Sequence, residues 1–230
     1  MSYDDFASTF SQSRKNLRWA EIEYFIAYIQ EHFSGKNISI LDIGCWNGRF
    51  LDSLENLLSP LSSERRGVGG EVDSCDFHHY LGIDESIGMI DEAKKLHQEH
   101  MFQVLDMNHL EELSDSTKYD VIVFIASFHH LHSKEERQDV LQKTKNLLSA
   151  GGIVMMTNWN LLGEPLFTKY QKWYTWDGDF SIKIGTHERY YHGFSTEELS
   201  QLFSENNYTV LENRIFEWGK NIVSLLQVKE

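Results

Sequence analysis

Three acidic side chains, each at the end of an apolar run, are well suited to hold a ligand. Asp42 lies at the end of the first run, Asp84 ends the second, and Asp106 follows the third. If these runs form neighbouring parallel strands, their carboxyl ends meet where open α/β sheets bind ligands. There Asp84 could accept both ribose hydroxyl protons and Asp106 could reach an adenine amino group. Each acid alone is more often a helix cap or turn residue, so the prediction depends on the spacing of all three.

A glycine-containing turn, residues 42–48, follows the first run. Gly44 lets the backbone approach a ligand closely, and Gly48 permits tight packing of the next helix. Alone, this turn is only a candidate nucleotide site, and a tight strand-to-helix connection is the less favoured explanation. A dinucleotide dehydrogenase is the competing class, but its G-x-G-x-x-G turn is absent because Trp46 stands between the two glycines.

The elements that must position these residues alternate between short apolar runs and amphipathic helical stretches. This alternation predicts a parallel sheet with helices on both faces. The last two runs are joined by a short turn at Gly219, so they must pair antiparallel. We therefore expect one α/β domain over residues 1–230, with a Rossmann-like, doubly wound, seven-stranded, mostly parallel sheet and an antiparallel C-terminal hairpin strand. The expected strands span residues 38–43, 80–84, 102–105, 121–125, 153–157, 208–216 and 222–228.

Two segments interrupt this pattern, and capping boxes mark helices near the second. Residues 59–79 form a polar, glycine-containing insertion, and residues 159–193 are expected to form a substrate lid. In a capping box, a serine and a glutamate three residues later cap the first turn of a helix. Such pairs predict helix starts at Ser133 with Glu136 and at Ser195 with Glu198. Gly151 and Gly152 are expected to end the helix before the fifth strand.

The bulk composition favours a cytoplasmic protein with an acidic surface. The net charge is −14, from 21 basic and 35 acidic residues, which disfavours nucleic-acid binding by general electrostatics. Two cysteines, Cys45 and Cys75, cannot build a disulfide framework. We find no signal peptide at the start of this sequence and no apolar run near the roughly 18 residues that a membrane span needs.

These features resemble the class I S-adenosylmethionine (SAM)-dependent methyltransferase superfamily over nearly the whole chain. Residues 42–48 match that family's first motif, and the segment 125–127 matches the region that lines the methionine and methyl-transfer side. Residues 148–152 match the usual L-x-P-G-G ending before the fifth strand. The family usually has glycine at the position of Trp46, where an inward-pointing indole would crowd the cofactor.

The resemblance implies SAM as the cofactor. Asp84 would contact the ribose, and Asp106 and Met107 would lie beside the adenine. Arg14 could clamp the SAM carboxylate with its planar fork, although a surface ion pair would also explain it. The cofactor-binding residues expected on this basis are Arg14, Asp42, Gly44, Cys45, Gly48, Asp84, Asp106, Met107 and Ala126.

Four shorter segments resemble the tRNA wobble-uridine carboxymethyl methyltransferases. They are residues 10–14 followed by Trp19; residues 125–130 followed by Glu136 and Arg137; Trp159; and Arg189-Tyr-Tyr-His192 followed by Phe194, Glu198 and Leu199. Arg-Tyr-Tyr-His is the most specific of these. The resemblance implies tRNA as a partner, and a small zinc-containing activator subunit as in the eukaryotic relatives.

The expected reaction is in-line displacement of the SAM methyl group, with donor and acceptor held in near-attack geometry. For a carboxylate acceptor, Arg189 would orient the nucleophile, and Trp159, Tyr190, Tyr191 and His192 would shape the substrate pocket. For an amine or hydroxyl acceptor, His129 or His130 becomes the candidate base.

Other interpretations of these residues stay open. The histidine pair could be a loop feature, the Arg-Tyr-Tyr-His segment could simply pack the lid, and the aromatic residues between 159 and 187 could form the lid's own core. A metal on His129, His130 and His132 is not expected, because no cysteine partner or second shell is apparent. At the level of function, a small-molecule methyltransferase and a non-catalytic SAM-fold binding protein remain the alternatives to a tRNA enzyme.

Overall fold

A computed structural model describes residues 19–58, 76–113, 116–184 and 187–229. Its centre is a seven-stranded sheet in the order β3-β2-β1-β4-β5-β9-β8. The first five strands pair parallel, β9 runs antiparallel to β5, and β8 runs antiparallel to β9. This confirms the predicted Rossmann-like fold. The strands are β1 (Asn37–Ile43), β2 (Asp76–Asp84), β3 (Met101–Val104), β4 (Tyr119–Ile125), β5 (Leu148–Trp159), β8 (Tyr208–Ile215) and β9 (Asn221–Val228).

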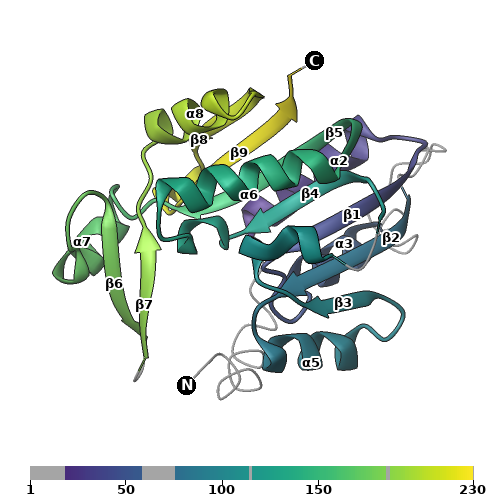
Figure 1. The fold of residues 1–230 in the computed structure, drawn as a ribbon, viewed down its shortest axis with the longest axis horizontal. Helices are drawn as coiled ribbons and strands as arrows, with labels where there is room; N and C mark the ends of the chain where they lie inside the picture. The colour runs from purple at the N-terminus through teal and green to yellow at the C-terminus, as the bar shows by residue number, and fades with distance from the viewer. Residues whose placement is uncertain (1–18, 59–75, 114–115, 185–186, 230) are drawn as a thin grey trace.

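Helices cover both faces of this sheet, as Figure 1 shows. Side chains of α2, α3 and α5 pack in one hydrophobic cluster, and those of α6 and α8 pack in another on the opposite face. Strand β4 contributes alternate residues to both clusters, for example Val123 to the first and Phe124 to the second, so it is buried on both faces. These helices are α2 (Ala20–His32), α3 (Arg49–Leu58), α5 (Ile87–Leu96), α6 (Lys134–Leu147) and α8 (Thr196–Glu205).

The capping boxes begin their helices where the sequence predicts. Ser133 Oγ accepts the N–H of Glu136 at 3.1 Å, and Ser195 Oγ accepts the N–H of Glu198 at 3.0 Å. No helix that the structure describes is long and apolar enough to cross a membrane.

Two strands begin four or more residues earlier than expected. β2 starts at Asp76, inside the segment predicted as an insertion, of which residues 59–75 lie outside the described residues. β5 starts at Leu148, because Leu148 pairs with Tyr119 before the register shifts. The glycine pair therefore lies within the strand, and α6 has already ended at Leu147.

The lid is a small subdomain of its own beside the sheet (Figure 1). Strands β6 (Asp179–Ile184) and β7 (His187–His192) form an antiparallel pair. They pack with α7 (Leu166–Tyr170) and the 3-10 turn η4 (Gln171–Trp173) around a third hydrophobic cluster centred on Phe180 and Tyr191. The sequence predicts a lid here but not its hairpin.

Candidate active site

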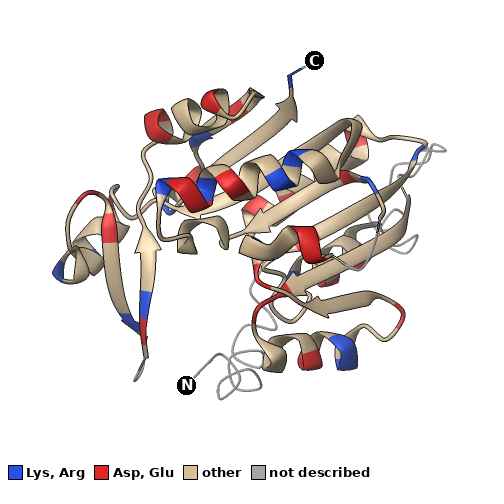
Figure 2. Cartoon of the chain, in the orientation of Figure 1, with Lys and Arg blue, Asp and Glu red and all other residues tan. Residues whose placement is uncertain are grey.

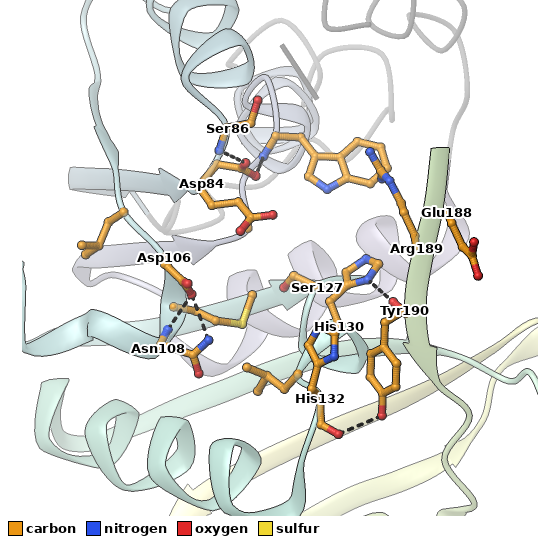
Figure 3. Close-up of a pocket in the computed structure, with 16 residues that line it drawn as sticks. Asp84, Ser86, Asp106, Asn108, Ser127, His130, His132, Glu188, Arg189 and Tyr190 are labelled. Atoms are coloured by element: carbon orange, nitrogen blue, oxygen red, sulfur yellow. Dashed lines mark hydrogen bonds between the residues drawn. The ribbon is translucent and has the colours of Figure 1, made fainter. Parts of the chain in front are cut away.

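A cavity of about 750 Å³ opens at the carboxyl ends of the parallel strands, with β7 forming one wall (Figure 3). This volume lies within the range of roughly 300–1,000 Å³ typical of small-molecule sites. Asp84 and Asp106 line it from the ends of β2 and β3, His130 lines it from the turn after β4, and Arg189 lines it from β7. The fold thus brings together the two strand-end acids and the lid arginine that the sequence singles out.

Both strand-end acids are fixed by hydrogen bonds to the backbone. Asp84 is almost buried, and its carboxylate accepts the N–H of Ser86 at 2.9 Å and the N–H of Trp46 at 3.0 Å. Asp106 caps the 3-10 helix η2 (Met107–Glu112) by accepting the N–H of Asn108 at 2.9 Å. Each acid therefore shapes its own turn and also faces the cavity, so the two explanations of these residues hold together.

The glycine turn is closely packed against the protein itself. Gly44 has φ +76°, and a Cβ at this position would lie 2.4 Å from the Cβ of Ser127. Ser127 Oγ in turn donates to the carbonyl of Ile43 at 2.6 Å. Gly48 has φ +86° and a Cβ there would come within 2.7 Å of the His97 ring. At Gly44 the absence of a side chain thus lets the turns after β1 and β4 pack together, and Gly44 also lines the cavity.

Trp46 faces the cavity and also borders a second, much smaller one. The second cavity, of about 10 Å³, shares Gly44 and Trp46 with the large cavity and is also lined by Asp42 and Cys45. Trp46 has φ +56°, a left-handed conformation that glycine adopts without strain. This explains why glycine suits the position. Since Trp46 lines both cavities, it lies at the boundary between them.

Asp42 offers a buried acceptor to the smaller cavity. Tyr80 donates its hydroxyl to Asp42 Oδ2 at 2.7 Å, while Oδ1 is buried and has no hydrogen-bond partner among the described residues. Burial raises the pKa of Asp42 to about 7, with the charge of Asp84 adding to the rise and the Tyr80 hydrogen bond opposing it. Burial also raises the pKa of the neighbouring Cys45 thiol. Arg49 also lines this cavity, which has room for about one water molecule.

The two adjacent histidines have different surroundings. His130 lines the cavity, and its Nδ1 lies 3.0 Å from the carbonyl oxygen of Tyr190, which only accepts, so Nδ1 carries the proton. Nε2 is then an acceptor. Burial lowers the pKa of His130, which keeps the ring neutral at pH 7. His129 is buried, accepts the backbone N–H of Trp159 at 3.1 Å, and does not line the cavity.

The residues after Arg189 anchor the lid to the sheet domain. The Tyr190 hydroxyl accepts from Arg137 Nη2 at 3.0 Å and donates to Asp179 Oδ1 at 2.6 Å. His192 lies between two carboxylates, 2.7 Å from Asp179 and 2.8 Å from Glu198 of α8. Arg137 is buried and also donates to the carbonyl of Leu131. This network, which we call the lid anchor, fixes the strand that carries Arg189.

Two of the aromatic residues expected to bind substrate instead form the lid core. Trp159 stacks on Tyr191 with ring centroids 5.1 Å apart and an interplanar angle of 14°. Neither lines the large cavity, and nor does His192, whereas Tyr190 does. Burial lowers the pKa of Arg189, and the hydrogen bond from Arg189 to Tyr191 opposes this. Tyr191 thus contacts the cavity residue Arg189 but does not itself line the cavity.

Several cavity residues have no individual signal in the sequence. Glu85, Ser86, Asn108 and Glu188 line the cavity, and only their positions beside predicted site residues could have indicated them. Three of the predicted cofactor residues remain. Arg14 lies outside the described residues, and Met107 lines the cavity. Ala126 is buried, has φ +54° and directly precedes the cavity-lining Ser127. Within the described residues, no three histidine, cysteine or acidic side chains are grouped so that they could hold a metal ion.

The comparisons with known proteins agree on one class. Residues 41–154 match the family described as Methyltransferase domain. A protein of Encephalitozoon cuniculi, provisionally named a methyltransferase, is 20% identical over 217 residues, which cover 92% of this chain and 87% of that protein. The tRNA (carboxymethyluridine(34)-5-O)-methyltransferase of Saccharomyces cerevisiae is 24% identical over 159 residues, which cover 69% of this chain and 47% of the yeast enzyme.

Solved structures share the fold over almost the whole chain. A SAM-dependent methyltransferase from Clostridium acetobutylicum superposes with a TM-score of 0.68 at 14% identity, covering 99% of both chains. A SAM-bound amino pentose methyltransferase from Micromonospora echinaspora superposes with a TM-score of 0.63 at 13% identity, covering 99% of this chain and 98% of that one. The family match, together with the strand-end acids, favours an enzyme over a non-catalytic binding protein. Residues 41–154 thus match a methyltransferase domain and the chain has the fold of SAM-dependent methyltransferases, which indicates an enzyme that uses SAM as its cofactor.

Proposed function

We propose that this methyltransferase acts on the carboxylate of a carboxymethyl-type group on a wobble uridine of tRNA. The observation that carries the proposal is the position of Arg189, which lines the same cavity as Asp84 and Asp106. Arg189 is the one arginine or lysine among the described residues that line this cavity. The similarity to the yeast carboxymethyluridine enzyme supports the same substrate class.

The chain's own residues suit SAM at this site. Asp84 and Asp106 would accept hydrogen bonds from the ribose hydroxyls and the adenine amino group. The buried, unpartnered Oδ1 of Asp42 would accept from the α-ammonium once the Trp46 indole moves, because the smaller cavity otherwise has room for about one water molecule. Because Trp46 borders both cavities, its indole must turn aside for one ligand to span them. When bound, SAM supplies an electrophilic methyl group.

A carboxylate acceptor needs little help with proton transfer. Since a carboxylate is already ionised at pH 7, the protein has to orient it and exclude water. The guanidinium of Arg189 would do this with two parallel N–H donors, a geometry that matches a carboxylate. His130 would shape the wall beside it while remaining neutral.

The neutral His130 favours a second candidate, methylation of a small-molecule amine or hydroxyl. Its proton on Nδ1 leaves Nε2 as an acceptor, as a general base requires. The net charge of −14 also suits a small acceptor better than an RNA bound over a wide surface.

One assay separates the two candidates. Methyl-tritiated SAM is incubated with the protein and with tRNA that carries unmethylated carboxymethyl groups, and the labelled tRNA is then treated with mild alkali. We expect the label to enter tRNA and to be released as methanol, because only an ester methyl is labile to alkali. Label that stays on the tRNA after this treatment, or no label in tRNA at all, would contradict the proposal.

A further inference from the structure

We propose that residues 169–176 of the lid bind a single-stranded part of the tRNA; the inference rests on the proposed function. We call this segment, with its exposed rings and lysines, the lid surface. Residues 165–176 contain two lysines and five aromatic residues but no acidic residue, in a chain with 35 acidic and 21 basic residues. Figure 2 shows basic residues on α7 at the outer end of the lid.

The rings of the lid surface are unusually exposed. Trp176 is 73% exposed and Tyr174 is 41% exposed. Among the described residues, three large aromatic side chains are exposed in this way, and the third is Trp218. Exposed apolar groups on a folded protein often mark an interaction site when they are gathered in one place. Two of the three lie within three residues of each other, in the segment that also carries the lysines.

The lysines lie next to two further rings of the same segment, which are partly buried. Lys172 Nζ is 4.0 Å from the centroid of the Trp173 ring, and Lys169 Nζ is 4.8 Å from the centroid of Tyr170. Ammonium groups beside aromatic faces are the combination with which proteins hold single-stranded nucleic acid, since the charge binds phosphate and the ring stacks on a base. An acidic peptide would use the charges but not the flat faces, so RNA fits both features.

A row of rings connects the lid surface with the cavity. Trp173 is followed by Tyr170 at 6.0 Å, Tyr170 by Trp159 at 5.9 Å, and Trp159 by Tyr191 at 5.1 Å between centroids. Tyr191 contacts the ring of His130 at 4.5 Å, and His130 lines the cavity. This row runs through the lid core, in which Tyr191 is 3% exposed, so packing links the position of the lid surface to the cavity wall.

The location also resolves the conflict between an RNA substrate and an acidic protein. The net charge of the whole chain repels phosphates. A local basic and aromatic segment would then give RNA a place to bind on a protein that is acidic overall.

The test is binding of a fluorescein-labelled single-stranded RNA of about 15 nucleotides, within the usual range of site sizes, measured by fluorescence anisotropy at low salt. The double variant Lys169→Glu with Lys172→Glu should weaken binding at least tenfold. The control, Lys94→Glu with Lys95→Glu on α5, makes the same change of charge on another helix and should weaken binding less than threefold. Equal weakening by both pairs, or no RNA binding by the wild type, would overturn the proposal.

A second pair of variants tests stacking separately from charge. Trp176→Ala should weaken RNA binding about fivefold to tenfold, as expected for the loss of one stacked base, whereas Trp176→Phe should retain most of the affinity. Equal affinities of the two variants would contradict a stacking role. All variants should bind S-adenosylhomocysteine (SAH) like the wild type, which shows that they are folded.

The methyl-transfer assay distinguishes failure of this inference from failure of the proposed function. If the lid variants methylate tRNA and bind RNA like the wild type, the inference fails and the proposed function stands. If the wild type places no alkali-labile methyl group on tRNA, the proposed function fails whatever the binding data show.

Discussion

The two walls of the cavity are held in place in different ways. On the sheet side, Asp84 and Asp106 are fixed by backbone N–H groups from within or next to their own turns, apart from the bond between Asp84 and Trp46. On the lid side, Arg189 depends on the lid anchor, in which Tyr190, Arg137 and Asp179 come from three separate elements. The sheet side is therefore built locally, whereas the lid side is built by long-range side-chain contacts. Substitutions on the two sides should accordingly affect different steps of the reaction.

The largest effect is expected for Arg189→Lys, which tests the lid side directly. A lysine keeps the charge but loses the planar fork, so the acceptor would be poorly oriented. We expect the turnover number to fall by about 100-fold, comparable with the loss of one donor to a reacting oxygen. SAH affinity, measured by calorimetry, should stay within threefold of the wild type.

A matched control is Arg214→Lys on β8, which removes a guanidinium outside the cavity. It should leave the turnover number unchanged. Similar losses of turnover and SAH affinity in Arg189→Lys would show that the arginine belongs to the cofactor side.

The next effect is expected for Asp84→Ala on the sheet side. The substitution removes a carboxylate that faces the cavity and that also accepts two backbone N–H groups. Hydrogen bonds to charged groups contribute about 1.5–3 kcal/mol each, so SAH affinity should fall about 30-fold or more by calorimetry. Asp84→Asn keeps the shape and should lose less. An unchanged affinity in Asp84→Ala would remove this acid from the cofactor site.

A smaller effect is expected for Tyr190→Phe, which breaks the lid anchor without touching the strand-end acids. The variant loses the hydroxyl between Arg137 and Asp179, at a cost of about 1 kcal/mol. We expect turnover to fall about fivefold while SAH affinity is retained. Loss of SAH binding in this variant would contradict the separation of the two walls.

The smallest effect is a pH dependence of stability that comes from Asp42. Its pKa in the folded protein is about 7, above its usual value of 3.8. The folded protein therefore retains a proton that the unfolded chain releases, and the free energy of unfolding should fall as the pH rises from about 4 to about 7.

Asp42→Asn keeps an acceptor for Tyr80 but cannot ionise. By calorimetry without cofactor, its melting temperature should exceed that of the wild type by a few degrees at pH 8, with a much smaller difference at pH 4. The same pH dependence in both proteins would show that Asp42 is not the group responsible.

The sequence predicts the sheet side well for the same reason that this side is locally built. A strand-end acid, its turn and the following helix lie close together in the chain, so Asp84 and Asp106 are recognised from short patterns. The lid is different. Whether Tyr190 or Tyr191 faces the cavity depends on the pairing of β7 with β6 and on partners such as Arg137, which lies 53 residues away. His129 and His130 are likewise adjacent in the chain, and only tertiary packing decides which of them reaches the cavity.

The most direct test of this account is a crystal structure of the protein with SAH. We predict that the ribose hydroxyls contact Asp84, that the α-ammonium reaches Asp42 past a displaced Trp46 indole, and that the sulfur faces Arg189 and His130. A complex in which Trp46 stays in place and SAH lies elsewhere, or in which the sulfur faces away from Arg189, would contradict it.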